Sequence, residues 1–427
     1  MTIERVCVIS DDAVESGGAA GVALRSVRLL AERGIPVTVL NGSGSPGGQG
    51  LPEGIDLHSL GARNLLQGWR GRAAMRGIYN GQVRSFVADW IARHDTPGTV
   101  YHLHNWHKVL SPAVFRALAP VSQRLVMTAH DYFLVCPNGG QFDFPHETAC
   151  ERVPLSIGCL ATQCDRRHYG HKLWRAGRQV VRQAAIDLSR SEATVVAVHD
   201  GMVPYLMRGG VAPDRIAVIR NPVVPWRSAR VIAEENAEIL FVGRLEKDKG
   251  VDVVAAAARD AGATLRIVGD GPLRAELERD HPEAIVMGWR SPAEIADLSA
   301  RARLAVVPTR WRETFGLVTL EALTSGVPVV VSRHALIAPE VVALGAAEAC
   351  DPYDRTGLAA ILRRLAADDR AISQMSRAGF EGGRDLAPDP QVWCDALIAL
   401  YIDRIAVSGR RSVLRRIGSV AAAAQAS

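Results

Sequence analysis

The sequence has little net charge and no long hydrophobic run. No uninterrupted apolar stretch approaches the ~20 residues that a membrane-spanning helix requires, and no charged segment followed by an apolar one opens the chain as a secretory leader would. We therefore expect a cytoplasmic protein. The net charge of +5 is small for 427 residues and no nucleic-acid reader motif accompanies it, so nucleic acid is not an expected partner.

The composition is that of a globular protein with enough apolar material for more than one core. Hydrophobic residues make up 48% of the chain and charged residues 22%. Because 427 residues exceed the usual size of one domain, we expect two α/β domains.

The first half alternates between predicted strands and helices. It opens with RVCVIS, a buried-strand pattern, followed by a loop with Ser16, Gly17 and Gly18 and then a helix. Such a loop suits a phosphate group, but the full dinucleotide fingerprint GxGxxG is missing, so we do not expect a dinucleotide. Helical segments between the strands predict a parallel sheet. Further strands are expected at 36–40, 55–60, 99–104, 124–128, 194–199 and 215–220.

Two histidines stand where predicted strands enter their loops. His104 follows the strand at 99–104, and His130 follows the strand at 124–128. The carboxyl ends of parallel strands form the edge of the sheet where ligands bind. Each histidine could donate a hydrogen bond to a sugar hydroxyl and could be charged beside a carboxylate such as Asp131. Alternatively, each is a structural histidine bonded to the backbone.

The pattern restarts after a proline-rich segment, NPVVPW, near Asn221. We place the domain boundaries so that residues 1–220, 221–390 and 391–427 form a first domain, a second domain and a C-terminal helix with a basic tail. The last helix could cross back to the first domain. In the second domain we expect strands at 239–242, 264–268, 284–287, 304–307 and 327–331, and helices at 251–259, 272–280 and 292–302.

The stretch from Leu304 to Ser332 carries the strongest functional pattern. A strand, a loop, a helix capped by Thr314 and a second strand are expected there, which places the loop at the ligand edge of the sheet. Glu313 precedes the helix and Glu321 lies within its first turns. The two carboxylates could meet different parts of one extended ligand, or they could only decorate a solvated helix start.

The backbone between these glutamates favours an anion. Phe315, Gly316 and Leu317 offer N–H groups without an intrahelical partner, and Gly316 permits a close approach. Carboxylates that can accept hydrogen bonds from hydroxyls thus flank backbone N–H groups that can donate to phosphate. This arrangement suits a nucleotide-diphosphate sugar.

The first loop of the second half, GRLEKDKG, supplies two cations. Arg244 and Lys249 follow the strand at 239–242, and Gly243 and Gly250 free the backbone on either side. Arginine offers a fork of donors and lysine a point charge, a suitable pair for a diphosphate. A solvated charged turn is the alternative. No residue of the chain is an obvious covalent nucleophile.

These motifs carry a family resemblance. GRLEKDKG, VGDGP, RETFGLVTLEALTSGVPVV, TAHD and the N-terminal glycine pair together resemble the retaining GT-B glycosyltransferases called family 4, over nearly the whole chain. The resemblance implies two Rossmann-like doubly wound domains facing a cleft, with the nucleotide-sugar donor on the second and a saccharide or lipid-linked acceptor on the first. It also implies that transfer requires no metal cofactor, and it suggests a role in polysaccharide or glycoconjugate synthesis.

The resemblance also implies roles for individual residues. Arg244 and Lys249 would hold the diphosphate and stabilise the leaving group, while Glu313 and His130 would contact the transferred sugar. Gly17, Gly18, Gly243 and Phe315 to Leu317 would bind the donor, Glu321 would hold the ribose, and His104 would lie on the acceptor side. One departure is SRHALIAPEVV, which keeps Pro339 and Glu340 but replaces the glycine pair common in the family.

Four of the seven cysteines lie in one loop, at Cys136, Cys150, Cys159 and Cys164. A reducing compartment disfavours a disulfide framework, so the thiols either hold a structural zinc ion or are free and buried. Their spacing lacks the CxxC pairs typical of zinc sites.

Two basic segments bear on further partners. Trp69, Tyr79 and Phe86 stand among Arg70, Arg72, Arg76 and Arg84, and the tail contains RRSVLRRIGSV. Such surfaces suit docking at the inner face of an anionic membrane, but solvated helix faces would have the same composition. Two rival functions also remain: a nucleotide-sugar epimerase or hydrolase of the same fold, and a non-catalytic nucleotide-sugar binding protein.

Overall fold

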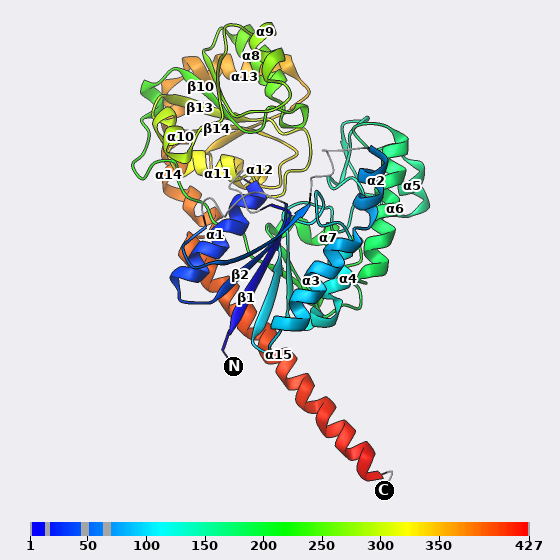
Figure 1. The fold of residues 1–427 in the computed structure, drawn as a ribbon. Helices are drawn as coiled ribbons and strands as arrows, with labels where there is room; N and C mark the ends of the chain where they lie inside the picture. Colours follow the sequence, from blue (N-terminus) through cyan, green and yellow to red (C-terminus); the bar gives the residue numbers. More distant parts are fainter. Residues whose placement is uncertain (1, 13–17, 44–50, 63–69, 426–427) are drawn as a thin grey trace. The chain divides into compact units, whose positions relative to one another are not determined.

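The computed structural model describes residues 2–12, 18–43, 51–62 and 70–425, with side chains up to residue 410 except at position 70. The chain forms two compact units (Figure 1). The first comprises 1–145, 150–219 and 391–427, and the second comprises 146–149 and 220–390. Each unit contains a parallel sheet between helices, which confirms the prediction of two doubly wound α/β domains.

The sheet of the first unit has seven strands in the order β3-β2-β1-β4-β5-β8-β9. Its central strand β1 is fully buried from Val6 to Ile9, as the apolar run RVCVIS predicts. The strand order reverses between β1 and β4, and a reversal of this kind opens a crevice at the carboxyl ends of the strands. The strands are β1 (Arg5–Ser10), β2 (Val37–Ser43), β3 (Asp56–Ala62), β4 (Thr99–Leu103), β5 (Leu125–Ala129), β8 (Thr194–Ala197) and β9 (Ile216–Val218).

Helices cover both faces of this sheet. The helices α1 (Gly18–Glu32) and α15 (Pro390–Gln425) meet on one face, where Arg33 pairs with Asp395 at 2.7 Å. On the other face α4 (Ala113–Leu118) packs between α3 (Gly81–His94) and α6 (Tyr169–Ala185) (Figure 1). The shorter elements are α2 (Arg70–Ile78), α5 (Ile157–Ala161), α7 (Val203–Arg208), β6 (Phe142–Asp143) and β7 (Thr148–Ala149).

The sheet of the second unit has six strands in the order β12-β11-β10-β13-β14-β15, so it reverses between β10 and β13. Its strands are β10 (Glu238–Val242), β11 (Leu265–Val268), β12 (Ile285–Gly288), β13 (Ala302–Val307), β14 (Val329–Ser332) and β15 (Ala347–Cys350). One face carries α8 (Val251–Ala261), α9 (Arg274–Asp280) and α13 (Arg355–Ala367) (Figure 1). The other carries α10 (Pro292–Ser299), α11 (Leu317–Leu323) and α14 (Asp369–Gly382), and α12 (Ala338–Ala343) precedes β15.

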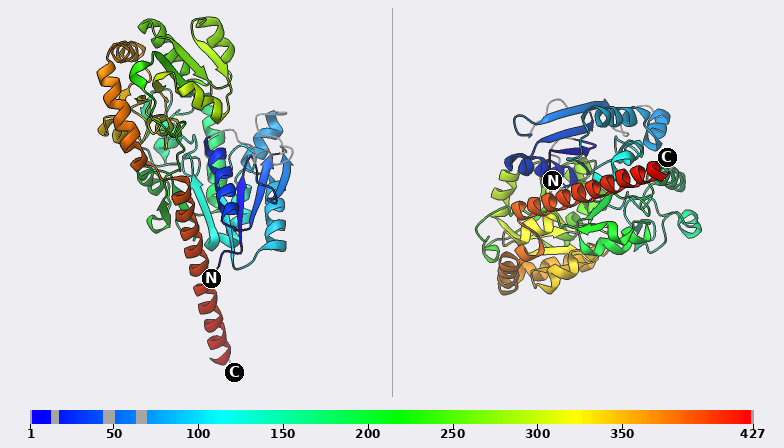
Figure 2. Two further views of the ribbon diagram at one scale, coloured as in Figure 1. Left: turned by 90° about the vertical axis from the view of Figure 1, so that its left-hand side faces the viewer. Right: turned by 90° about the horizontal axis from the view of Figure 1, so that it is seen from below.

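The helix α15 runs along the strands of the first unit (Figure 2). Its buried side chains Trp393, Leu397, Tyr401 and Ile405 recur every four residues and form one apolar face. The Tyr401 hydroxyl lies 2.6 Å from Nδ1 of His102, whose Nε2 lies 2.7 Å from the Thr128 hydroxyl. This buried chain of hydrogen bonds fixes α15 against β4 and β5. No helix among the described residues has an apolar stretch that could cross a membrane.

We expect Tyr401→Phe to lower the free energy of unfolding by about 1–3 kcal/mol, because it leaves Nδ1 of the fully buried His102 without its partner. Urea unfolding measures the change. Ile402→Ala on the exposed side of α15 is the matched control and should alter stability by about 0.5 kcal/mol or less. Equal stability of Tyr401→Phe and the parent would contradict the role assigned to this contact.

Candidate functional site

An ion pair lies at the carboxyl ends of β10 and β13, where the strand order of the second unit reverses. The Lys249 ammonium is 2.9 Å from one carboxylate oxygen of Glu313, and the Thr309 hydroxyl donates to the other oxygen at 2.7 Å. Burial opposes ionisation of Glu313, but Lys249 and Thr309 outweigh it and hold the pKa of this carboxyl below its usual value. Glu313 is therefore charged at neutral pH. The two side chains remain 21% and 16% exposed, so a ligand can reach them.

A glycine brings the two loops of the ion pair together. Gly250 has a φ of 71°, and a Cβ there would lie 2.4 Å from the carbonyl oxygen of Pro308. Any side chain at this position would therefore push the Lys249 loop away from the loop that follows β13. Trp311 adds a second contact, since the Lys249 ammonium lies 5.9 Å from the centre of its ring.

The helix next to this pair begins later than the sequence suggests. The residue at its N-cap is Gly316, with a φ of 83°, rather than Thr314. Thr314 is buried, and the left-handed turn at Gly316 starts a helix of only seven residues. No group in the described chain accepts a hydrogen bond from the N–H of Phe315, Gly316 or Leu317. These three individual donors, rather than the dipole of so short a helix, are what the site offers to an anion.

Glu321 lies on α11 and is half-buried. One of its carboxylate oxygens accepts a hydrogen bond from the Trp226 indole at 3.3 Å. Trp226 belongs to the segment that enters the second unit, and the sequence gives no signal that it orients this carboxylate. Glu321 and Glu313 thus have different partners, an indole and an ammonium.

Arg244 is placed differently from Lys249. Its guanidinium is 58% exposed and pairs with Glu246 at 2.9 Å. The loop that starts at Gly243 packs against the next loop so closely that a Cβ at Gly269 would lie 1.8 Å from the Gly243 carbonyl oxygen. Gly269 of the GDGP turn is therefore required by the close packing of the two loops.

In the first unit, His104 and His130 lie at the ends of β4 and β5. Nδ1 of His104 is 3.0 Å from Nε2 of His130, and the two rings stack with their centres 5.3 Å apart. Burial lowers the pKa of His130 to about 3 and that of His104 well below its usual value. The expectation that Asp131 could charge such a histidine is wrong for His130, because both histidines are neutral and Asp131 instead faces His107 at 3.7 Å.

Two carboxylates of the first unit, Asp131 and Asp11, have backbone N–H groups as partners. Burial raises the pKa of Asp131 to about 6, and its Oδ1 accepts from the Phe133 N–H at 2.8 Å. Asp11, directly after β1, accepts hydrogen bonds from the N–H groups of residues 108–110, each at 2.8 Å. It fixes the loop after β4. Sequence reasoning missed Asp11, although its place after the central strand was a usable signal.

The glycine pair is only partly described. Gly17 lies outside the described residues. Gly18 is the first residue of α1, has a φ of 55° and leaves open space where a Cβ would stand. Glycine is therefore favoured at position 18 by the positive φ of the turn and not by a lack of space for a side chain.

The predicted structural zinc at Cys136, Cys150, Cys159 and Cys164 is not supported. All four thiols are free and buried, and no group of three or more His, Cys, Asp or Glu side chains within the described ranges could hold a metal ion. Instead the buried Lys172 amine donates to the sulfurs of Cys159 at 3.4 Å and Cys164 at 2.9 Å. A cation thus already contacts two of the four sulfurs.

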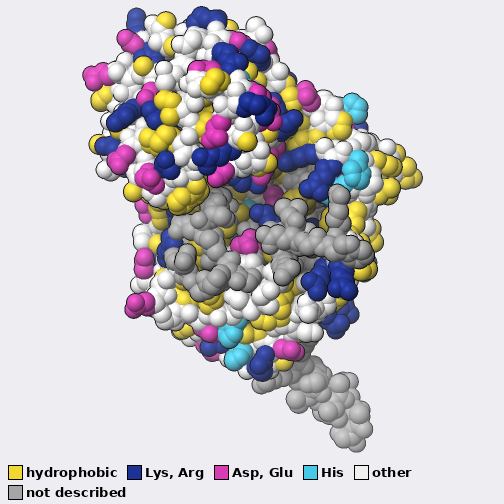
Figure 3. Space-filling model, turned by 45° about the horizontal axis from the view of Figure 1, so that its top comes forward, with side chains coloured by type: hydrophobic (Ala, Val, Ile, Leu, Met, Phe, Trp, Pro, Cys, Tyr) yellow, Lys and Arg dark blue, Asp and Glu magenta, His cyan; other side chains and the backbone are white. Residues whose placement is uncertain are grey.

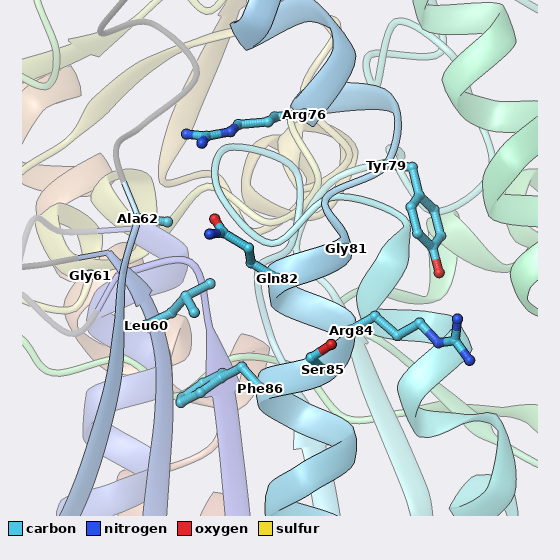
Figure 4. A pocket seen from close by; sticks show the side chains of 10 residues that line it. All are labelled: Leu60, Gly61, Ala62, Arg76, Tyr79, Gly81, Gln82, Arg84, Ser85 and Phe86. Carbon is cyan, nitrogen blue, oxygen red and sulfur yellow. The ribbon is translucent and has the colours of Figure 1, made fainter.

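A hollow of about 920 Å³ lies between β3 and the helices α2 and α3. Arg76 and Gln82 reach toward Ala62, and Phe86 faces Leu60, whereas Tyr79 and Arg84 extend on the other side of α3 (Figure 4). No acidic residue is among its described lining residues, so the hollow suits a polar or anionic group. Trp69, the other aromatic residue of this basic segment, lies outside the described residues.

Two family models match adjoining parts of the chain. Glycosyl transferases group 1 matches residues 225–381, and a glycosyl transferase 4-like domain matches residues 17–222. The chain belongs to the glycosyltransferases. A glycogen synthase of Mycobacterium tuberculosis is 33% identical to this glycosyltransferase over 272 residues, which are 59% of the chain. The matched part is 63% of that relative, less than two thirds of its length.

Solved structures show that the fold of this glycosyltransferase is GT-B. Sucrose-phosphate synthase from Thermosynechococcus elongatus superposes with a TM-score of 0.69 and 19% identity, covering 95% of this chain and 100% of the other. Anabaena HepE in complex with UDP-glucose superposes with a TM-score of 0.62 and 16% identity, covering 93% and 99%. At these identities the likeness establishes the architecture alone.

The buried neutral histidines are expected to make the folded glycosyltransferase less stable in acid. Burial lowers the pKa of His102, His104 and His130, so below pH 6.5 each of them takes up a proton when the chain unfolds. Asp131 has the opposite effect: its raised pKa means that it releases a proton on unfolding at pH values between its ordinary pKa and about 6. The net uptake is one to two protons, each worth about 1.4 kcal/mol per pH unit. We therefore expect the free energy of unfolding to fall as the pH is lowered from 6.5 to 5.

Urea unfolding of His104→Asn over the same pH range measures the contribution of His104 to this pH dependence. The slope of stability against pH should be shallower than in the parent by about 1.4 kcal/mol per pH unit. Ile402→Ala, which removes no titratable group, is the control and should keep the parental slope. A parental slope in His104→Asn would mean that this histidine is charged in the folded protein.

Proposed function

We propose that this glycosyltransferase moves a sugar from a nucleotide-diphosphate sugar to a saccharide or lipid-linked saccharide, with retention of the anomeric configuration. Its expected setting is the synthesis of cell-surface polysaccharide or glycoconjugate. The observation that carries the proposal is the Lys249–Glu313 pair beside three free N–H groups at the ligand edge of the second unit. Donors for phosphate and an acceptor for sugar hydroxyls are adjacent there.

The diphosphate would bind to Lys249, Arg244 and the N–H groups of residues 315–317. An ammonium has three donors, and Lys249 spends one on Glu313. Arg244 can turn away from Glu246 at little cost, because an exposed ion pair contributes only about 0–1 kcal/mol. Gly243, next to Arg244, would leave the backbone there free of a side chain and open to the donor.

The two carboxylates would divide the rest of the donor. Glu313 is ionised and paired with Lys249, and it would accept hydrogen bonds from the transferred sugar. Glu321, oriented by Trp226, would accept from the ribose hydroxyls. Gly17 and Gly18 of the first unit would close over the phosphates, as the family resemblance implies.

The chemistry would depend on electrostatic stabilisation of the departing nucleoside diphosphate. Negative charge grows on the leaving phosphate as the glycosidic bond breaks, and Lys249 and Arg244 would offset it. The acceptor hydroxyl would attack from the same face that the diphosphate leaves and would give its proton to the departing phosphate oxygen, which retains the configuration without a covalent intermediate. No step requires a metal ion.

The first unit would supply the acceptor side. His130 is neutral and could donate one hydrogen bond to the transferred sugar, with His104 behind it on the acceptor side. The complex of HepE with UDP-glucose supports a nucleotide sugar as donor for a protein of this fold.

We expect Arg244→Ala to lower turnover by about 100- to 1000-fold, the usual loss when one donor to a developing charge is removed. Its effect on folding should be small, because the side chain is 58% exposed. Lys249→Ala should lose as much activity and also some stability, since Glu313 is left with Thr309 alone. Steady-state transfer assays and thermal unfolding measure the two effects.

The control for Arg244 is Arg274→Ala. This arginine is also exposed and paired with acidic residues, but it stands on α9. Its turnover should match that of the parent. If Arg244→Ala also turns over like the parent, the diphosphate assignment is wrong.

Glu313 and Glu321 can be separated by calorimetric titration with the nucleotide sugar and with the nucleoside diphosphate. We expect Glu321→Gln to weaken both ligands by about tenfold or more, because a hydrogen bond to a charged group contributes about 1.5–3 kcal/mol. Glu313→Gln should lower transfer but spare the affinity for the diphosphate, since it frees Lys249 from its partner. Equal loss of diphosphate affinity in the two variants would end this division of roles.

Incubation with donor alone distinguishes transfer from the rival activities. A transferase should leave most of the donor intact until an acceptor is added. Rapid conversion of the donor sugar or its release as free sugar without acceptor would identify an epimerase or a hydrolase. Binding without turnover under any acceptor would identify a binding protein.

A further inference from the structure

The helix α6 has the reverse of the usual polarity. Its buried side chains include Lys172, Arg178, Gln179 and Arg182. Its exposed side chains form an apolar stripe at helical spacing: Tyr169 is 42% exposed, Leu173 45% and Val180 54%, with Gly177 and Ala184 between and after them. Helices that face water and a protein core normally show the opposite arrangement. The outer stripe is therefore suited to an apolar environment outside the unit.

The stripe continues onto α5. The Tyr169 hydroxyl donates to the carbonyl oxygen of Leu160 at 2.8 Å, which joins the start of α6 to α5. On α5, Ile157 is 87% exposed and Leu160 36%. We call the five side chains of Ile157, Leu160, Tyr169, Leu173 and Val180 the outer face of α6. Figure 3 shows hydrophobic side chains gathered at the right edge of the view, where α5 and α6 lie, with Lys and Arg side chains beside them. Contiguous exposed apolar side chains of this kind mark interaction sites.

Positive charge outweighs negative charge in the segment that carries this face. Residues 152–186 contain seven Lys and Arg and one acidic residue, Asp165. Asp165 is buried and already pairs with His171 at 2.9 Å and Arg175 at 3.2 Å. Arg166 and Arg167 are exposed just before α6.

The neighbouring helix adds to this charge. The helix α2 lies beside α6, where the Trp174 indole donates to the Ala74 carbonyl oxygen at 3.1 Å. Its exposed side chains include Arg72, Met75 and Arg76, and residues 63–86 contain no Asp or Glu. No acidic residue of α2 therefore offsets the cations around α6.

The buried cations of α6 strengthen the field. Lys172 contacts thiols and Arg182 contacts the Ile186 carbonyl oxygen at 3.2 Å, so neither is neutralised by a carboxylate within hydrogen-bond distance. Burial lowers the pKa of Arg178 and Arg182 to about 10, which leaves both charged at neutral pH. Uncompensated charges in a low-dielectric interior project a positive potential to the surface above them.

We propose that the outer face of α6 docks on an anionic lipid bilayer. A bilayer offers an apolar layer for Ile157, Leu160, Leu173 and Val180, lipid phosphates for the surrounding arginines, and an interface for the Tyr169 ring. A second copy of the chain would bring the same positive charge against itself, so self-association is disfavoured. The docking is independent of sugar transfer, since no residue of this face belongs to the donor site.

Co-sedimentation with vesicles tests the docking. The full-length protein should sediment with vesicles of phosphatidylcholine mixed with phosphatidylglycerol, should not sediment with phosphatidylcholine alone, and should be released by salt. The double variant Ile157→Ser with Leu173→Ser should bind at least about tenfold more weakly, because it removes two inserting side chains. Val392→Ser with Ile402→Ser, two exposed apolar residues of α15, is the matched control and should bind like the parent.

A second pair of variants tests the charge. Arg72→Glu with Arg167→Glu should lower binding to the mixed vesicles by about tenfold or more, since each arginine near an anionic surface contributes to binding. Arg370→Glu with Arg377→Glu, on α14 of the second unit, changes the net charge equally and should leave binding nearly unchanged. All four double variants should keep parental affinity for the nucleotide sugar by calorimetry, so that a failure of docking is distinct from a failure of the donor site.

Three outcomes would overturn the proposal. One is the absence of sedimentation with the mixed vesicles at low salt. Another is equal binding by the parent and by both variants of the outer face. The third is a dimer in sedimentation velocity that Ile157→Ser with Leu173→Ser abolishes, which would assign the face to a second copy of the chain.

Discussion

The ion pair between Lys249 and Glu313 is the contact on which the candidate donor site depends. It joins the loops that follow β10 and β13, and Gly250 and Pro308 touch beneath it so closely that no side chain fits between them. Without Lys249, burial would favour the neutral form of the Glu313 carboxyl group. Without Glu313, the Lys249 ammonium would lose the carboxylate that holds it in its present position. In the function that we propose, the pair places a charged acceptor for sugar hydroxyls beside a charged donor for phosphate.

The two units use charge in opposite ways at equivalent edges of their sheets. In the second unit, cations and carboxylates are paired and remain charged. In the first, three histidines lie next to one another in the interior and burial keeps them neutral. A neutral imidazole can both donate and accept a hydrogen bond, which suits an uncharged sugar better than a phosphate. The difference in protonation matches the division of donor and acceptor between the units that we propose.

The helix α6 shows why composition alone can mislead. Its arginines and lysine look like a solvated face, yet they are the buried side, and the apolar residues face outward. Lys172 donates to thiols and Arg182 to a backbone carbonyl oxygen. The Arg178 guanidinium lies 4.9 Å from the centre of the Trp106 ring. The same cluster accounts for two of the four cysteines, since the sulfurs of Cys159 and Cys164 accept hydrogen bonds from Lys172, and all four thiols are free and buried, the alternative to a zinc site.

Much of the architecture could be predicted because its signals are local. The apolar runs at 5–10, 99–104 and 239–242 identify central strands, since strands buried on both faces must be apolar along their whole length. The fold class predicted from these runs is confirmed by the two parallel sheets. The strand β15 (Ala347–Cys350) was missed because AEAC, at the edge of the sheet, carries no such run.

For the candidate site, the sequence predicts which loops and residue types come together, and the roles of these residues stay predictions. Glu313, Lys249 and the N–H groups of residues 315–317 were expected near one ligand, because strand ends converge at one edge of a parallel sheet. Which groups touch was decided by tertiary structure. Thr309 and Lys249 bind Glu313, Trp226 binds Glu321, and the buried Asp11 holds a loop about a hundred residues further along the chain. Local sequence sets which elements form, whereas protonation and partnership depend on burial and on residues brought from distant segments, which only the folded chain determines.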